Sequence, residues 1–202
     1  SVRLVGSEMC IRDSIITALI SYLFGSIPFG YIFTKIFLKK DIRDVGSGNI
    51  GATNVLRTGN KRLGYLTLIL DILKAVIPVI YVKLYYPDLI FISALCAFLG
   101  HLFPVWLKFD GGKGVATFVG ILISINIYYA LIFGIIWVLT FIISKYSSLS
   151  SLIASISIPI YILILGNGNF IFFTIMFVLI FYTHRENIKR LINKEETKSK
   201  IY

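Results

Sequence analysis

The stretch Leu63–Tyr86, LGYLTLILDILKAVIPVIYVKLYY, decides the fold class of this chain. A helix of about 20 apolar residues crosses a bilayer, and this stretch is longer than that and has Asp71, Lys74 and Lys83 as its only charged residues. Four further apolar stretches are Ile15–Leu38, Leu89–Leu107, Val115–Ser144 and Ser147–Tyr182, the last broken by Gly166-Asn167-Gly168-Asn169. The pattern predicts an all-α, polytopic integral membrane protein.

The composition agrees with a chain that is solvated by lipid. Of 202 residues, 57% are hydrophobic and 15% are charged, and the mean hydropathy is +0.85. The net charge of +10 then indicates loops that face anionic lipid, and we expect no nucleic acid partner. Cys10 and Cys96 provide neither a disulfide framework nor a metal-ligand cluster, so we expect no metal and no cofactor.

The distribution of basic residues predicts the topology. Positive charges gather in Lys39–Arg62, Lys108–Lys113, at Lys145 and in Arg185–Lys200, and basic loops favour the cytoplasmic side. All four lie on one side if Val115–Ser144 crosses twice, turning near Ser124–Tyr128. This predicts seven transmembrane helices, with the N-terminus outside and the C-terminus in the cytoplasm. The alternative is one long, tilted helix over Val115–Ser144, which would place the basic tail outside.

Three segments are expected along the chain. Residues 1–14 show no signal-peptide core and resemble a translated cloning scar, so we interpret them as a non-native leader. Residues 15–193 form the single transmembrane domain, and residues 194–202 form a polar cytoplasmic tail.

The longest polar loop, Asp41–Arg57, has the character of an anion-binding loop. It contains G-x-G-x-x-G at Gly46, Gly48 and Gly51, but no parallel strand precedes it, so the dinucleotide-binding interpretation fails. Glycines let backbone N–H groups converge on an anion, polar side chains add donors, and arginines match phosphate geometry. The alternative is a flexible turn. The residues we expect to bind substrate here are Arg43, Gly46, Ser47, Gly48, Asn49, Thr53, Asn54 and Arg57.

A second glycine-rich loop, Phe109–Thr117, leads directly into an apolar stretch. It is not a Walker A loop, because Gly114 follows Lys113 where Ser or Thr is required. Gly112 and Lys113 at the start of a helix nevertheless favour anion binding, since unpaired N–H groups and an ammonium group meet there. The alternative is a lysine that only extends to the membrane interface.

The segment Thr183–Arg190 supplies the third set of polar residues. On a continuing helix, His184, Asn187 and Leu191 share one face. Taken alone, His184 is equally compatible with an interfacial histidine in a basic tail. We interpret His101 as a buried structural histidine that donates to a backbone carbonyl, and not as catalytic, and Asp71 and Lys74 can pair one helical turn apart.

Several catalytic patterns are missing from the sequence. There is no G-x-S-x-G motif, and neither histidine begins an H-x-x-x-x-D motif. The remaining polar groups suit an anionic substrate that is handled by hydrogen-bond donors and cations.

Four ordered motifs resemble the PlsY family, the acyl-phosphate-dependent glycerol-3-phosphate acyltransferases. They are Gly25–Gly30 (GSIPFG), the Gly46–Arg57 loop, His101–Pro104 (HLFP) with Gly111–Thr117, and His184–Leu191. The resemblance implies a bacterial inner-membrane enzyme, with its active site facing the cytoplasm, that makes lysophosphatidic acid from acyl phosphate and glycerol 3-phosphate. It implies phosphate-handling roles for Ser47, Arg57, Lys113, His184 and Asn187, and we take Lys113, His184 and Asn187 as the catalytic set.

Some questions remain open at this level. Asp110 stands where the family motif usually has lysine, which weakens the positive field near Lys113. Either His184 or a substrate phosphate oxygen can act as the base. A small-anion transporter and a non-catalytic scaffold for anionic lipid are the alternatives from other functional classes.

Overall fold

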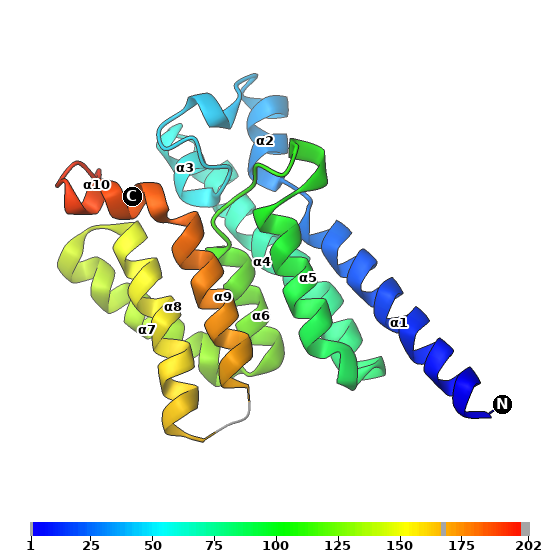
Figure 1. Cartoon of the computed structure of the whole chain (residues 1–202). Coiled ribbons are helices and arrows are strands. Elements are labelled where there is room, and N and C mark those ends of the chain that lie inside the picture. The colour runs from blue at the N-terminus through cyan, green and yellow to red at the C-terminus, as the bar shows by residue number, and fades with distance from the viewer. Residues whose placement is uncertain (1, 167–168, 199–202) are drawn as a thin grey trace. The chain divides into compact units, whose positions relative to one another are not determined.

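The computed structural model describes residues 2–166 and 169–198, with side chains from residue 10 onward. Every regular element in these ranges is a helix, which confirms the all-α prediction (Figure 1). The chain divides into two compact units. Unit 1 comprises the residues up to Gly112 together with Ala116–Ile125, and unit 2 comprises Lys113–Val115 together with the residues from Asn126 onward.

Unit 1 is built on three long helices with short helical turns between them. Helix α1 packs along α5, and α4 packs against both. The close approach of α1 and α5 depends on small residues, since a Cβ atom on Gly100 would meet the backbone of Tyr22 and Ser26. The elements of unit 1 are α1 (Val2–Gly25), α2 (Phe29–Phe37), η1 (Ile42–Asp44), α3 (Ala52–Arg57), α4 (Lys61–Tyr85), η2 (Pro87–Leu89), α5 (Ile90–Leu102), η3 (Val105–Leu107) and α6 (Val115–Ile125).

The apolar stretch Ile15–Leu38 forms two helices. Its hydropathy alone suggested a single spanning helix, and the structure differs from that expectation. Helix α1 ends at Gly25, and α2 resumes at Phe29 after the N-cap residue Pro28. Proline disfavours helical geometry in the residue before it and is well tolerated at a helix start, which explains the break. Helix α1 also begins at Val2, within the segment that we interpreted as a leader. The leader interpretation itself stays a prediction.

A buried ion pair lies inside α4. Lys74 Nζ is 2.8 Å from Asp71 Oδ1, and both residues are almost completely buried. Lys74 Nζ also donates to the carbonyl oxygen of Ile27 at 2.9 Å, in the break between α1 and α2. The predicted pairing is therefore confirmed, and it has a second role. The lysine adds a second donor to a backbone carbonyl at the helix break, which also accepts from the Phe29 N–H at 3.2 Å.

The stretch Val115–Ser144 is divided close to where the sequence predicted a turn. Helix α6 ends at Ile125, and α7 (Ile127–Ser144) begins after Asn126, whose side chain accepts a hydrogen bond from the Tyr128 N–H. Lys83 Nζ of α4 donates to the last carbonyls of α6, those of Ser124 and Ile125. The division is confirmed, whereas the double crossing stays a prediction.

Unit 2 contains three long helices and one short one. Its elements are α7, α8 (Ser147–Ile164), α9 (Phe170–Thr183) and α10 (Arg185–Ile192). Helix α8 packs against α7 and α9. Aromatic contacts join all three, because the Tyr129 ring of α7 lies 6.2 Å from Tyr161 of α8 and 5.5 Å from Phe173 of α9. Asn167 and Gly168, in the predicted break of the stretch Ser147–Tyr182, lie outside the described residues.

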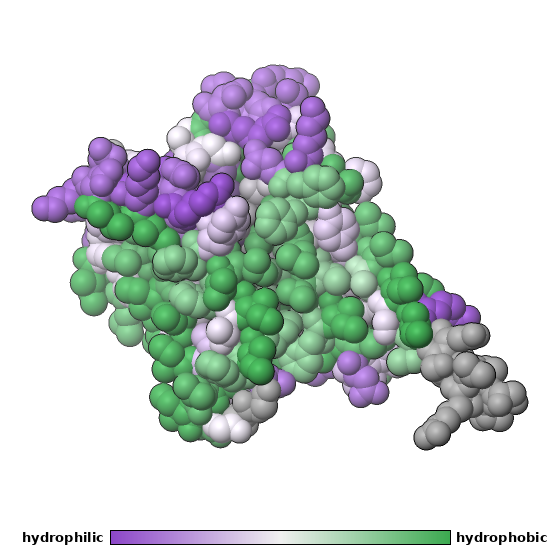
Figure 2. Space-filling view, viewed as in Figure 1, coloured by the Kyte–Doolittle hydropathy of each residue, from purple (hydrophilic) through white to green (hydrophobic). Residues whose placement is uncertain are grey.

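The surface of the long helices is apolar (Figure 2). Large side chains such as Leu84, Ile143, Ile164 and Ile171 are at least 69% exposed, which suits lipid rather than water. Hydrophilic side chains cover α10 and, separately, the polar loop that follows α2 (Figure 2). Among the residues that the structure describes, five helical segments are long and apolar enough to cross a membrane, or six if α9 and α10 form one bent span. The prediction of seven spans is therefore not confirmed.

Replacing Lys74 by methionine should destabilise the protein. The substitution leaves the Asp71 carboxylate without its ion-pair partner and removes one of two donors from the Ile27 carbonyl, and breaking a buried pair costs about 3–5 kcal/mol. Thermal unfolding in detergent measures the effect. The double variant Asp71→Leu/Lys74→Met should recover much of the loss, whereas equal stability of Lys74→Met and the unmodified protein would contradict this account.

Candidate functional site

The loop Ile42–Arg57, which we name the first glycine loop, is anchored by its own apolar residues. Ile42, Ile50 and Val55 are buried and pack with Leu63 and Leu107 in one cluster. In the sequence, Ile42, Ile50 and Val55 are separated from one another by polar and glycine residues. The loop therefore has a core beneath it, which argues against the flexible-turn alternative.

Asn54 holds this loop from the inside. Its side chain is 1% exposed, and Nδ2 donates to the carbonyl oxygens of Val45 at 2.8 Å, Asn49 at 2.9 Å and Ile42 at 3.1 Å. Its Oδ1 atom accepts a hydrogen bond from the Ser47 N–H at 3.0 Å. The sequence predicted Asn54 as a substrate ligand. The structure instead shows an amide whose donor and acceptor groups both bind the loop backbone.

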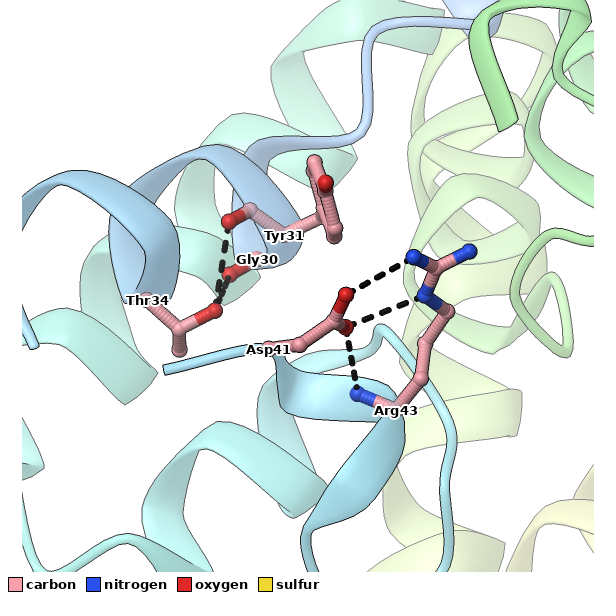
Figure 3. Close-up of polar contacts among 5 residues, drawn as sticks. All are labelled: Gly30, Tyr31, Thr34, Asp41 and Arg43. Carbon is pink, nitrogen blue, oxygen red and sulfur yellow. Dashed lines mark hydrogen bonds and ion pairs between the residues drawn. The ribbon is translucent and has the colours of Figure 1, made fainter. Parts of the chain in front are cut away.

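Arg43, a predicted phosphate ligand, already holds a carboxylate (Figure 3). Its Nη2 and Nε atoms donate to the two oxygens of Asp41 at 2.7 and 3.0 Å, and its guanidinium lies 5.1 Å from the centre of the Tyr31 ring. The hydrogen bond from Arg43 lowers the pKa of Asp41 to about 2. This bidentate pair fixes the start of the first glycine loop.

The remaining predicted ligands of the first glycine loop keep accessible surface. Gly46 and Thr53 are exposed, and Ser47, Gly48, Asn49 and Arg57 are partly exposed. Gly46 and Gly48 have φ angles of 57° and 70°, a backbone conformation that favours glycine. No ion pair of Arg57 is found among the residues that the structure describes. Apart from the Gly48 N–H, which donates to the Val45 carbonyl oxygen at 3.0 Å, these groups are the ones available to an anion.

The second glycine loop rests on His101. The Gly112 N–H donates to the His101 carbonyl oxygen at 3.0 Å, and a Cβ atom on Gly112 would collide with the His101 ring. His101 is buried, as predicted, with Nδ1 3.9 Å from Asp71 Oδ1. In the described part of the chain that nitrogen has no hydrogen-bond partner, so the predicted bond to a backbone carbonyl is not seen there.

In unit 2, Lys113 and His184 lie near each other. The hydroxyl of Thr183 donates to the Lys113 carbonyl oxygen at 3.2 Å, and the charge of Lys113 acts on the His184 ring. His184 is 2% exposed, and its Nδ1 atom lies 2.8 Å from the Ile180 carbonyl oxygen. A carbonyl only accepts, so Nδ1 carries the proton and Nε2 is the nitrogen available for chemistry.

The sequence predicted that one helix continues through His184. The structure shows a break there instead. The axis bends by 61° between α9 and α10, with His184 at the junction. Helix α9 is apolar on all sides, whereas α10 carries charged residues, and this change of solvent accounts for the bend. Asn187 is buried in the first turn of α10.

Two polar residues of this region escaped the sequence analysis. Glu196 accepts hydrogen bonds from Asn187 Nδ2 at 2.7 Å and from Ser148 Oγ at 2.8 Å, both on Oε1. Its Oε2 atom accepts from Arg190 Nε at 2.7 Å. No sequence pattern joins Ser148 to a tail residue so far along the chain. The one signal that could have pointed to Glu196 was Asn187, a polar residue predicted to face the site and therefore expected to need a hydrogen-bond partner.

No group of three or more metal-ligating side chains occurs in residues 2–166 and 169–198. In the described residues, fold and polar groups together define an all-helical integral membrane protein with an internally hydrogen-bonded glycine loop and a buried histidine and asparagine.

Comparison with known proteins assigns the family. A family model described as glycerol-3-phosphate acyltransferase matches residues 15–194. The glycerol-3-phosphate acyltransferase of Pelagibacter ubique is 73% identical over 94% of this chain and 100% of the relative. That of Rhodopseudomonas palustris is 49% identical over 96% of this chain and 98% of the relative.

Two crystal structures of PlsY, an integral membrane glycerol 3-phosphate acyltransferase, have the same fold. The glycerol 3-phosphate form has a TM-score of 0.88 and 36% identity, and the lysophosphatidic acid form has a TM-score of 0.85 and 35% identity. Each match covers 93% of this chain and 96% of the other. The chain therefore belongs to the glycerol-3-phosphate acyltransferase family, and the resemblance read from the sequence is confirmed.

Replacing Asn54 by alanine should loosen the first glycine loop. The change removes the side-chain partner of the Asn49 carbonyl and the Ser47 N–H, at about 1–3 kcal/mol for each group that stays buried, and one of two donors from the Ile42 and Val45 carbonyls. Hydrogen exchange at the amides of residues 46–51 should become faster. Asn60→Ala is the matched control: Asn60 only caps α4, so the variant should lose about 1 kcal/mol without faster exchange in the loop. Unchanged exchange in Asn54→Ala would contradict the assigned role.

Proposed function

We propose that this protein moves a fatty acyl group from acyl phosphate to the 1-hydroxyl of sn-glycerol 3-phosphate. The products are lysophosphatidic acid and inorganic phosphate. The observation that carries the proposal is the first glycine loop, in which Asn54 fixes the backbone from within while Ser47 and Arg57 stay accessible. The PlsY structures named for their glycerol 3-phosphate and lysophosphatidic acid forms support the choice of acceptor and product.

The reaction needs no nucleophile from the protein. The hydroxyl oxygen attacks the acyl carbon, the bond from that carbon to the phosphate oxygen breaks, and phosphate leaves with the electron pair. Acyl phosphate is already activated, so binding the phosphate groups and aligning the hydroxyl with the carbonyl supply much of the rate acceleration.

The proposed roles follow the chemistry of each residue. In the first glycine loop, Ser47, Asn49, Thr53, Arg57 and the Gly46 N–H bind phosphate oxygens. Arg43, Asn54 and Gly48, whose N–H donates to the Val45 carbonyl oxygen, act indirectly by holding the loop. In the second loop, Lys113 binds phosphate and stabilises its developing charge, whereas Gly112, whose N–H donates to the His101 carbonyl oxygen, acts indirectly by holding the loop.

The hydroxyl proton has two candidate acceptors. The first is His184, because its Nδ1–H is engaged by Ile180 and its Nε2 then presents a lone pair. The second is an oxygen of the departing phosphate, with His184 as a hydrogen-bonding group. Asn187 completes the proposed catalytic set with Lys113 and His184.

Transfer of acyl groups in detergent tests the proposal. Purified protein given acyl phosphate and radiolabelled glycerol 3-phosphate should form lysophosphatidic acid. Arg57→Ala and Lys113→Ala should each lower kcat/KM by about 10²-fold or more, since each loses a charged donor. Arg43→Ala is the matched control and should lose much less, because Asp41 already holds its guanidinium.

Absence of product from folded wild-type protein would contradict the acyltransferase proposal and favour an anion transporter or a lipid-binding scaffold. Wild-type turnover by Lys113→Ala would remove the second loop from the reaction.

The proposed location is the bacterial inner membrane, with seven spans, the N-terminus outside and the active site on the cytoplasmic side. Residues 15–193 are the proposed catalytic domain, and membrane lipid is the proposed surrounding partner. The basic stretches on loops support this orientation.

Accessibility of single cysteines tests this topology. In a background without Cys10 and Cys96, labels at Lys61, Asp110 and Lys198 should react only from the cytoplasmic side. A label at Asp88, which lies in η2, should react only from outside. An external label at Lys198 combined with a cytoplasmic one at Asp110 would show that Val115–Ser144 does not cross twice.

A further inference from the structure

The buried carboxylate of Glu196 is the centre of a polar cluster in unit 2. The Glu196 side chain is 7% exposed. Three groups donate to it: the Ser148 hydroxyl from the first turn of α8, and the Asn187 amide and the Arg190 guanidinium from α10. A tail residue thus occupies a site built by two helices.

The backbone after α10 brings Glu196 into this position. Lys194 adopts a φ of 61°, and the chain reverses there. The N–H of Lys194 donates to the Leu191 carbonyl oxygen, and those of Glu195 and Glu196 donate to that of Arg190. Such a left-handed C-terminal turn is a common helix stop. The position of Glu196 is therefore fixed by the backbone as well as by its side-chain partners.

Glu196 is held in its ionised form. Burial raises the pKa of its carboxyl group, but the hydrogen bonds from Arg190, Asn187 and Ser148 outweigh burial, and the pKa lies below its usual value. An ionised carboxylate has no proton to donate. Every group that faces it must therefore be a donor.

This requirement decides the orientation of the Asn187 side chain. Its amide nitrogen must face Glu196, because only that end can donate. The other end, Oδ1, is buried and has no hydrogen-bond partner among the residues that the structure describes. Asn187 as a whole is 4% exposed. A buried acceptor without a donor is unfavourable by about 1–3 kcal/mol.

We propose that Asn187 Oδ1 accepts a hydrogen bond from a hydroxyl group of glycerol 3-phosphate, and that Glu196 is the positioning residue that presents this oxygen. The inference rests on the proposed function and deepens it. An ionised phosphate has only acceptor oxygens, so it does not complement Oδ1, whereas a hydroxyl group does. Asn187 then orients the acceptor substrate, in place of the phosphate-handling role that the family resemblance implied.

An exchange of the two functional groups tests the orientation. Asn187→Asp faces Glu196 with a second carboxylate and should lose about 10²-fold or more in kcat/KM. In Asn187→Asp/Glu196→Gln the new glutamine donates to the new aspartate, whose second oxygen again faces the substrate as an acceptor. We expect the double variant to be at least about tenfold more active than Asn187→Asp.

A donor role for Asn187 predicts the opposite result. Aspartate cannot donate and adds a negative charge, so a folded double variant no more active than Asn187→Asp would overturn the proposal. Asn193→Asp, the same change at an exposed position at the end of α10, is the matched control and should remain close to wild type. Thermal unfolding checks that each variant is folded.

Binding of substrate analogues gives an answer even if the Glu196 variants do not fold. Asn187→Ala should bind glycerol 3-phosphate about tenfold more weakly. It should bind either the 1-deoxy or the 2-deoxy analogue as well as wild type does, and that analogue identifies the hydroxyl that Oδ1 accepts. Equal losses for all three ligands would place the contact at the phosphate and overturn the proposal.

The two proposals fail in different ways. Wild-type protein that makes lysophosphatidic acid without rescue in the double variant contradicts only the orientation of Asn187. Wild-type protein that makes none, yet binds glycerol 3-phosphate through a hydroxyl contact at Asn187, contradicts only the acyl transfer.

Discussion

The constraint on which this structure depends is that a polar group inside a bilayer must find its partner within the protein. Hydrocarbon offers no hydrogen bonds, so each break in a membrane helix exposes carbonyl groups that some side chain has to satisfy. Lys74 does so for Ile27, and Lys83 does so for the end of α6.

The same rule shapes the polar loops, although the partners there come from the loops themselves. Asn54 binds three carbonyl groups of the first glycine loop, and the His101 carbonyl receives the Gly112 N–H of the second. Apolar anchors such as Ile42 and Val55 add burial to this bonding. Rigid loops lose less entropy when an anion binds, so residues that never touch substrate contribute to its affinity.

Hydropathy predicted the helical class and most of the membrane segments, because runs such as Leu63–Tyr86 allow little else. It did not predict the break at Pro28, where apolar residues continue on both sides, or the bend at His184, where the apolar residues of α9 give way to the charged residues of α10. The residue types in the sequence were enough to find the two glycine loops. They did not reveal the hydrogen bonds inside the first loop, because Asn54 and Arg43 are residue types that can equally well bind a ligand. Glu196 was missed since its partners Ser148 and Asn187 are set by tertiary packing.

Asn54 and Asn187 show how a structure separates support from chemistry when the residue type is the same. Both are buried asparagines beside polar loops, and the sequence predicted both as site residues. Asn54 spends its amide on three carbonyl groups and its oxygen on the Ser47 N–H, so none of its groups is left for a ligand. In Asn187 only the amide nitrogen has a partner, the Glu196 carboxylate. Because a carboxylate accepts only from the nitrogen, Oδ1 is the atom that stays unpaired in the described structure. A buried polar atom left unpaired by the fold is unfavourable, and it becomes favourable only when a complementary group arrives.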